Sequence, residues 1–212
     1  MGPVTLKEEN MARSTIFLLL LIAFSPGALA QDEVKITLVN GTETEKATQI
    51  QLERLIADHD LSKWTFTKEV RIEDGVIPHS HPVLTLSTRH LKDDELLLST
   101  YVHEQIHWFL SDNRKKTDAA KAEFRKKWPD VPSGGPEGAR DEDSTYLHIA
   151  VVYLEYRAVR ELLGELRAMS VMDFWKRDHY RWIYRTVQES PREVGKIMFD
   201  HGLIPREQTA GR

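Results

Sequence analysis

The segment STYVHEQIHWFL, residues 99–110, holds the side chains in this sequence that are best suited to chemistry. It places His103 and His107 four residues apart, with Glu104 directly after the first histidine. On a helix, residues four apart share a face, so both imidazoles can bind one metal ion. Glu104 then lies beside the ion, where a carboxylate can accept a proton from a metal-activated water. The pattern predicts a hydrolytic metal site; the alternative is a pair of ordinary hydrogen-bonded core histidines.

A third metal ligand must come from another element, because catalytic zinc keeps three protein ligands and one open position. The segment TYLHIAVVYLEYRAV, residues 145–159, is apolar almost all round and still contains His148 and Glu155, which would share one helix face. A buried carboxylate needs a partner, and Glu155 has only apolar residues one turn away, so it is the preferred third ligand. His148 is the alternative ligand. With Glu155 on the metal, His148 would act on the substrate side or as an oxyanion donor.

A hydrolase of this kind also needs a donor for the oxyanion of the transition state. The segment RDHYRWIYRTV, residues 177–187, offers His179, Tyr180 and Tyr184. His179 has apolar neighbours at helical spacing and is the preferred catalytic candidate, whereas Tyr180 lies near two basic residues. The alternative for His179 is a hydrogen-bonded histidine within an aromatic core stripe.

His79 and His81 form an H-x-H pair in the segment IPHSHPV, residues 77–83. On a strand the two side chains would share a face and could bind a metal. The flanking turn residues favour solvent-side positions or a substrate subsite instead.

The elements that must position these groups follow from local patterns. Alternation of apolar and polar residues predicts strands in the N-terminal third, and apolar residues at helical spacing predict helices after Asp93, which is a good N-cap. Ser190 and Pro191 are a typical N-cap and first helical residue. The expected strands are 34–39, 66–72 and 83–86, and the expected helices are 45–57, 93–110, 115–128, 144–164, at least one within 171–189, and 191–201.

These elements predict an α+β fold, with a small N-terminal sheet and a mostly helical body, in one domain over residues 31–212. Residues 129–143, PDVPSGGPEGARDED, are rich in proline and glycine and predict a loop between the two ligand-bearing helices. That loop is either a lid over the cleft or a connection without function.

HEQIH, with the strand VLTL upstream and LEYRA downstream, resembles the zincin superfamily of metallopeptidases, in its gluzincin branch and among its small members. The resemblance covers about residues 83–159. It implies one Zn²⁺ ion bound by His103, His107 and Glu155, with Glu104 as the general base.

The same resemblance implies a peptide or protein substrate that lies extended along an edge strand and pairs with it through backbone hydrogen bonds. Here Leu84 to Thr88 would supply that edge. The expected function is therefore that of an exported zinc metallopeptidase. Two alternatives stay open: an inactive zincin-like domain that binds a peptide or a partner, and a non-haem iron enzyme with two histidines and one carboxylate as ligands.

The first thirty residues predict a secretory signal peptide. Arg13 precedes an apolar run at residues 16–24, and the small residues Ala28 and Ala30 follow at cleavage spacing. The run is much shorter than the roughly twenty residues that span a bilayer. We expect a mature chain from Gln31, in the periplasm or secreted, without stable membrane insertion; an uncleaved anchor is the alternative.

Composition excludes several classes of function. The 212 residues contain no cysteine, which excludes a thiolate nucleophile and a cysteine-ligated metal. The hydrophobic share of 41% is enough for a core, and the net charge of −4 supplies no global basic field for nucleic acid. We therefore expect no nucleic-acid partner.

Overall fold

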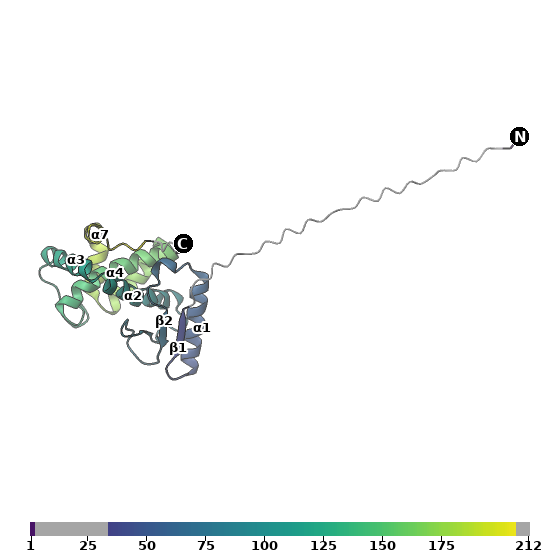
Figure 1. The fold of residues 1–212 in the computed structure, drawn as a ribbon, viewed down its shortest axis with the longest axis horizontal. Coiled ribbons are helices and arrows are strands. Elements are labelled where there is room, and N and C mark those ends of the chain that lie inside the picture. The colour runs from purple at the N-terminus through teal and green to yellow at the C-terminus, as the bar shows by residue number, and fades with distance from the viewer. Residues whose placement is uncertain (3–33, 207–212) are drawn as a thin grey trace. The chain divides into compact units, whose positions relative to one another are not determined.

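The computed structural model describes residues 1–2 and 34–206, and residues 34–206 belong to one compact unit (Figure 1). The predicted signal peptide lies outside the described residues, apart from its first two. Three strands and seven helices in the described residues confirm the α+β class. None of these helices is long and apolar enough to cross a membrane. The elements are β1 (Lys35–Leu38), α1 (Glu43–Asp58), η1 (Ser62–Trp64), β2 (Glu69–Ile72), β3 (Leu84–Leu86), α2 (Asp94–Asp112), α3 (Arg114–Lys127), α4 (Glu142–Leu163), α5 (Glu165–Asp178), α6 (Arg181–Glu189) and α7 (Pro191–Asp200).

The sheet is parallel throughout, in the order β1-β2-β3. Parallel neighbours need a crossover connection, and α1 provides it between β1 and β2. α1 packs against both strands, and Figure 1 shows it beside β1. All three residues of β3 are buried, as expected for a short apolar strand next to the core.

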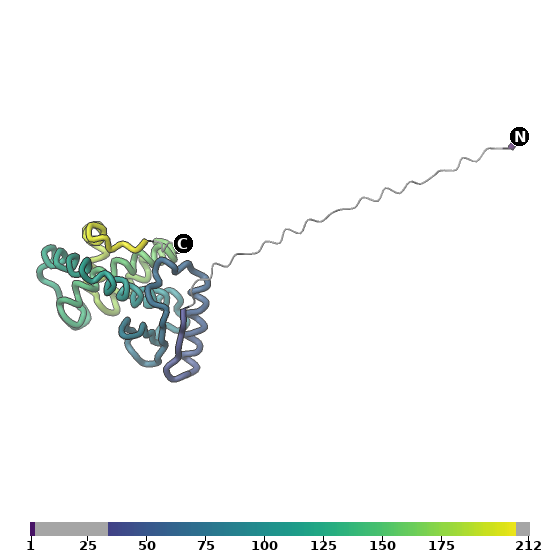
Figure 2. Tube along the Cα trace, in the orientation of Figure 1, coloured from purple at the N-terminus to yellow at the C-terminus, as the bar shows by residue number. Residues whose placement is uncertain are grey.

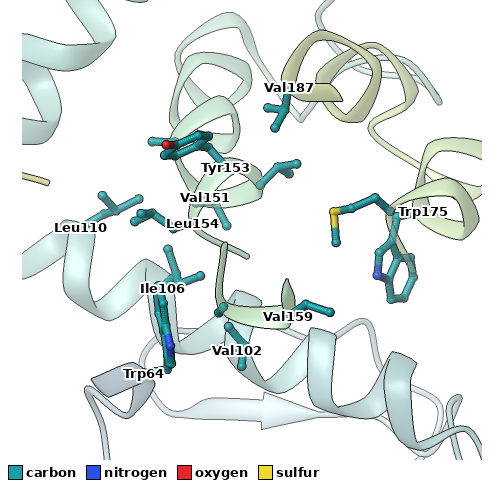
Figure 3. Close-up of a cluster of buried hydrophobic side chains, with 14 of the residues drawn as sticks. Trp64, Val102, Ile106, Leu110, Val151, Tyr153, Leu154, Val159, Trp175 and Val187 are labelled. Carbon is teal, nitrogen blue, oxygen red and sulfur yellow. The ribbon is translucent and has the colours of Figure 1, made fainter. Parts of the chain in front are cut away.

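α2 connects the sheet to the helical body. It begins after Asp93, whose side chain accepts a hydrogen bond from the Leu96 backbone N–H at 3.1 Å, as the N-cap pattern predicts. The helix packs against α1 and β3, and also against α4 and α5. Figure 3 shows side chains of α2 such as Ile106 facing those of α4 such as Leu154. The helix expected over residues 93–110 is therefore confirmed, and much of it is buried.

The helical body contains two sharp breaks that decide where side chains point. Gly164, with φ of 85°, ends α4, and α5 follows at once. α5 ends at Asp178, and Tyr180 takes a left-handed conformation (φ 51°, ψ 36°) before α6 begins. Residues 171–189 therefore belong to two helices with different axes, which follow each other along the green-to-yellow part of the trace (Figure 2).

Candidate metal centre

Three histidines from two helices form a group that could hold a metal ion. His103 and His107 come from α2 and His148 from α4, and one nitrogen of each lies within 4.8 Å of the others. The ring centroids are 5.2 Å apart for His103 and His107, 5.7 Å for His103 and His148, and 5.0 Å for His107 and His148. The spacing in HEQIH brings the first two together, and the packing of α4 on α2 supplies the third.

Two of the three imidazoles are held in one orientation. His103 Nδ1 lies 2.8 Å from Glu155 Oε2, and His148 Nδ1 lies 2.7 Å from the Ser144 carbonyl oxygen. A carboxylate and a carbonyl oxygen accept, so Nδ1 carries the proton in both rings. The Nε2 lone pair then remains for a metal.

Glu155 lies behind His103 and not in the group of three. Its carboxylate accepts hydrogen bonds from the Ser99 hydroxyl at 2.5 Å, from His103 Nδ1 and from the Tyr184 hydroxyl at 3.0 Å. Trp175 Nε1 donates to Ser99 Oγ at 3.0 Å and extends the network. The geometry therefore favours the alternative, His148, over the preferred Glu155 as third ligand. A protonated ring nitrogen and two hydroxyls satisfy the buried carboxylate without a metal.

Burial sets the protonation of the histidines. It lowers the pKa of His107 well below the usual range and lowers the pKa of His148 to about 3. Burial also disfavours the charged form of His103, but the hydrogen bond and negative charge of Glu155 outweigh it and raise the pKa of that ring. His107 and His148 are therefore neutral at neutral pH, which is the form that binds metal.

Glu104 differs from Glu155 in having no described hydrogen-bond partner. It is 7% exposed and lines the cavity next to the three histidines. Burial raises the pKa of Glu104 to about 7, against the opposing effects of His103 and His79. A carboxyl with that pKa can both take up and release a proton near neutral pH.

The cavity at this group has a volume of about 600 Å³. Its walls come from the segment before β3, from the loop before α2, from both ligand helices and from the α5–α6 break. The lining residues are Ile77, Pro78, His79, Ser80, Arg89, His90, Thr100, His103, Glu104, His107, Arg140, His148, Glu155, Trp175, Asp178, His179, Tyr180 and Tyr184.

His179 lines this cavity and is held by an acidic neighbour. Its Nδ1 lies 2.8 Å from Asp178 Oδ2, and Arg89 binds the same carboxylate with two nitrogens, at 2.5 and 3.1 Å. The hydrogen bond from Arg89 lowers the pKa of Asp178 to about 2, so this carboxylate stays charged. Asp178 favours the charged form of His179, but burial is the larger effect and lowers the pKa of the ring. With the proton on Nδ1, the Nε2 of the neutral ring carries a lone pair and can accept a hydrogen bond from a ligand; the expected donor role needs the protonated ring.

Tyr180, which sequence reasoning ranked below His179, also belongs to the cavity. Its ring centroid lies 4.5 Å from that of His148 and 4.6 Å from that of His179. The lower preference for Tyr180 depends on a helix that continues through it from the basic residues before it. The structure has no such helix, because the chain breaks at Tyr180 itself. A left-handed backbone at a non-glycine residue is uncommon, and such conformations concentrate at functional sites. Tyr184 faces inward as well, but its hydroxyl is bound to Glu155.

The segment 77–81 forms the outer wall and changes the expected substrate edge. The backbones of His79 and Thr85 exchange two hydrogen bonds, at 3.0 and 2.7 Å, in an antiparallel bridge. The outer edge of β3 is therefore occupied at Thr85, inside the stretch Leu84 to Thr88 where a peptide was expected to pair. His81 stacks on Trp108 at 4.3 Å between ring centroids, and Trp108 Nε1 donates to the Ser80 carbonyl at 2.8 Å.

The loop at residues 129–143 is tied to the start of α6. The backbone N–H groups of Arg181 and Trp182 donate to the carbonyls of Pro136 and Glu137, at 3.0 and 3.1 Å. These bonds satisfy first-turn N–H groups that a helix leaves open. Because the helix start follows directly on Tyr180, the loop supports that side of the cavity.

Comparison of the chain with protein-family models, with curated proteins and with solved structures finds no match.

Proposed function

We propose that this protein is a zinc-dependent hydrolase, and specifically a peptidase, whose metal is held by His103, His107 and His148. The observation that carries the proposal is Glu104, a buried carboxyl with a pKa near 7 and no described partner, beside three imidazoles that could hold a metal. Three nitrogen ligands suit zinc, and a zinc ion bound in this way would lower the pKa of a bound water to about 7.

The residues of the chain then have distinct roles. Glu104 accepts the proton of the attacking water and returns it to the leaving amine. Tyr180, packed against His148, supplies a donor to the oxyanion, and His179, oriented by Asp178, adds a second one when its ring is protonated. Glu155 orients His103 from behind.

A peptide substrate fits the segment 77–80 better than the edge of β3. Antiparallel pairing turns both backbone groups of His79 toward Thr85, so Ser80 presents its own N–H on the opposite side. His79, Ser80 and Ile77 line the cavity, and Ile77 is 86% exposed, so an extended chain could pack on its side chain.

The two alternatives differ in what they need. A non-haem iron enzyme with two histidines and one carboxylate would need Glu155 as a ligand, and its oxygens already bind Ser99, His103 and Tyr184. An inactive peptide-binding domain would have no use for a carboxyl with a pKa near 7. The third histidine also departs from the glutamate that the gluzincin resemblance implies.

The test is turnover of a mixed peptide library by the purified protein in three states: as isolated, after treatment with a chelator, and after return of stoichiometric zinc or iron. The proposal expects cleavage that chelation removes and zinc restores. Restoration by iron alone would contradict the zinc assignment, and peptide binding without cleavage in every state would favour the binding domain. We further propose export to the periplasm or medium, tested by mass spectrometry for a mature start at Gln31.

A further inference from the structure

A second cavity, of about 460 Å³, lies between α4 and α7 and shares no lining residue with the metal centre. On α4, Tyr153, Arg157 and Arg160 lie about a third of a turn or more away from the face that carries His148 and Glu155. Its most distinctive feature is charge. Four cationic side chains line it, and we call it the α4–α7 groove: Arg157, Arg160, Arg192 and Lys196.

Two of these four cations lack a compensating carboxylate. Arg160 lies 3.7 Å from Glu165, and Lys196 is paired with Asp200. Within residues 34–206, Arg157 and Arg192 form no ion pair. In a chain with a net charge of −4, two unpaired guanidinium groups in one groove are a specific attraction for an anion. The planar fork of arginine matches the oxygens of phosphate and carboxylate.

A buried tyrosine hydroxyl adds a donor to the floor of the groove. Tyr153 is 8% exposed and packs among the apolar side chains of α4 (Figure 3). Its hydroxyl accepts from Arg157 Nη1 at 3.4 Å, and no acceptor for its own proton lies within the described chain. Gly195 is required for this placement, because a Cβ there would lie 2.4 Å from the Tyr153 hydroxyl oxygen.

The start of α7 lies at the same place, and its first turn holds Arg192 and the acidic Glu193. Pro191 and Arg192, the first two residues of this ten-residue helix, line the groove. The preceding Ser190 makes no side-chain cap hydrogen bond, so the first-turn N–H groups are not satisfied by a side-chain cap. Such N–H groups favour an anion.

We propose that the α4–α7 groove binds a phosphate-type dianion, either free or as the phosphate group of a small organic ester. Arg157 and Arg192 bind the anion through their guanidinium groups, and the Tyr153 hydroxyl donates to it. The volume is in the range of small-molecule sites and leaves room for an organic part beside Tyr156. The proposal is independent of the metal centre and of its chemistry.

The test is titration of the full-length, metal-loaded protein at constant ionic strength, followed by backbone amide shifts in NMR. The probes are inorganic phosphate, glycerol 1-phosphate and vesicles of phosphatidic acid, which separate a free anion, a soluble monoester and a lipid headgroup as the source. We expect saturable shifts in residues 153–160 and 191–196. Absence of saturation by all three probes, or shifts confined to α2, would overturn the proposal.

Paired variants separate a site from general electrostatics. Arg157→Gln with Arg192→Gln is expected to weaken binding at least tenfold. Arg71→Gln with Arg114→Gln removes the same charge from exposed positions elsewhere and is expected to change the binding affinity less than twofold. Equal losses in the two pairs would contradict a site in the groove.

Two single variants keep the test decisive should the paired variant fail to fold. Arg192 is exposed, so Arg192→Gln alone leaves the core untouched, and Tyr153→Phe removes only a hydroxyl. Each is expected to weaken binding severalfold and to leave the midpoint of thermal unfolding unchanged. Wild-type affinity in both would overturn the proposal.

Discussion

Glu104 and Gln105 are neighbours on α2, and both are buried. The fold supplies hydrogen-bond partners for the side chain of only one of them. On the sheet side, Gln105 Oε1 accepts from the backbone N–H groups of Phe66 and Thr67, at 2.7 and 2.8 Å. Its Nε2 donates to the Thr67 carbonyl at 2.8 Å and to the Tyr101 hydroxyl at 2.9 Å. On the cavity side, Glu104 has no hydrogen bond from any described residue, and burial raises its pKa to about 7.

The difference separates a structural polar group from one that is available for chemistry. Gln105 fixes the segment before β2 against α2, and all of its donors and acceptors are used. Glu104 bears the cost of burial without a hydrogen bond from any described residue, which a fold tolerates where a ligand or a reaction supplies the partner. The same contrast holds between Glu155, whose carboxylate has hydrogen-bond partners in the chain, and His107, for which no described hydrogen bond exists.

The largest expected effect is on turnover. Glu104→Gln should lower kcat by about 10²–10⁴-fold, because the proton acceptor is removed. It should leave zinc bound and should not lower the free energy of unfolding, because no described group depends on this carboxylate. Peptide cleavage, zinc content and urea unfolding of the same preparation check all three. Wild-type turnover in the variant would contradict the role of Glu104.

The pH dependence of stability isolates the burial cost of Glu104. Its folded pKa of about 7 lies above the ordinary 4.5, so the folded state holds the proton more tightly than the unfolded state. The stabilisation is complete below about pH 4.5 and is lost as pH rises through 7. In zinc-free protein, the difference in unfolding free energy between wild type and Glu104→Gln should fall by about 3 kcal/mol from acid to pH 8. A difference that stays flat between pH 5 and pH 8 would contradict the burial cost of the Glu104 carboxylate.

Gln105 should behave in the opposite way. Gln105→Ala leaves two backbone N–H groups and one carbonyl without partners and should cost about 3 kcal/mol of unfolding free energy. It should not alter zinc content per folded molecule. Gln49→Ala, on the outer side of α1, is the matched control and should cost less than about 0.5 kcal/mol. Similar losses for the two alanine variants would remove the distinction between the two sides of α2.

The smallest effect is expected from substitution of Glu155, because side chains of the chain already donate hydrogen bonds to its carboxylate. Glu155→Gln can still accept from His103 Nδ1 but loses the negative charge, so zinc affinity should fall about 10–100-fold with the fold intact. Glu161→Gln, on the exposed side of the same helix, should leave it unchanged. Competition with a chromophoric chelator measures both. A complete loss of zinc in Glu155→Gln would return Glu155 to the role of direct ligand.

Local sequence patterns were enough to predict those parts of the site that lie on a single helix. His103, His107 and Glu104 follow from HEQIH, the start of α2 follows from Asp93, and the α+β order follows from the change of period along the chain. The choice between His148 and Glu155 could not be made in that way. Both lie on one face of α4, and only the packing of α4 on α2 decides which of them reaches the other histidines.

Two further features depend on contacts between distant segments. Tyr180 enters the cavity because α5 and α6 are separate helices, whereas a continuous helix would direct it elsewhere. His79 occupies the edge of β3 through a backbone bridge to Thr85, and no local pattern predicts that pairing. Extended segments that pair antiparallel beside a parallel sheet carry little signal in their own sequence.

The most direct test of the account is the zinc content of His148→Ala beside wild type, His103→Ala and the control His59→Ala, which changes a histidine outside the group. Elemental analysis after dialysis against limiting zinc should find one ion per chain in wild type and His59→Ala. It should find essentially none in His103→Ala and His148→Ala, with all four proteins folded by circular dichroism. Full zinc occupancy in His148→Ala would contradict the three-histidine centre.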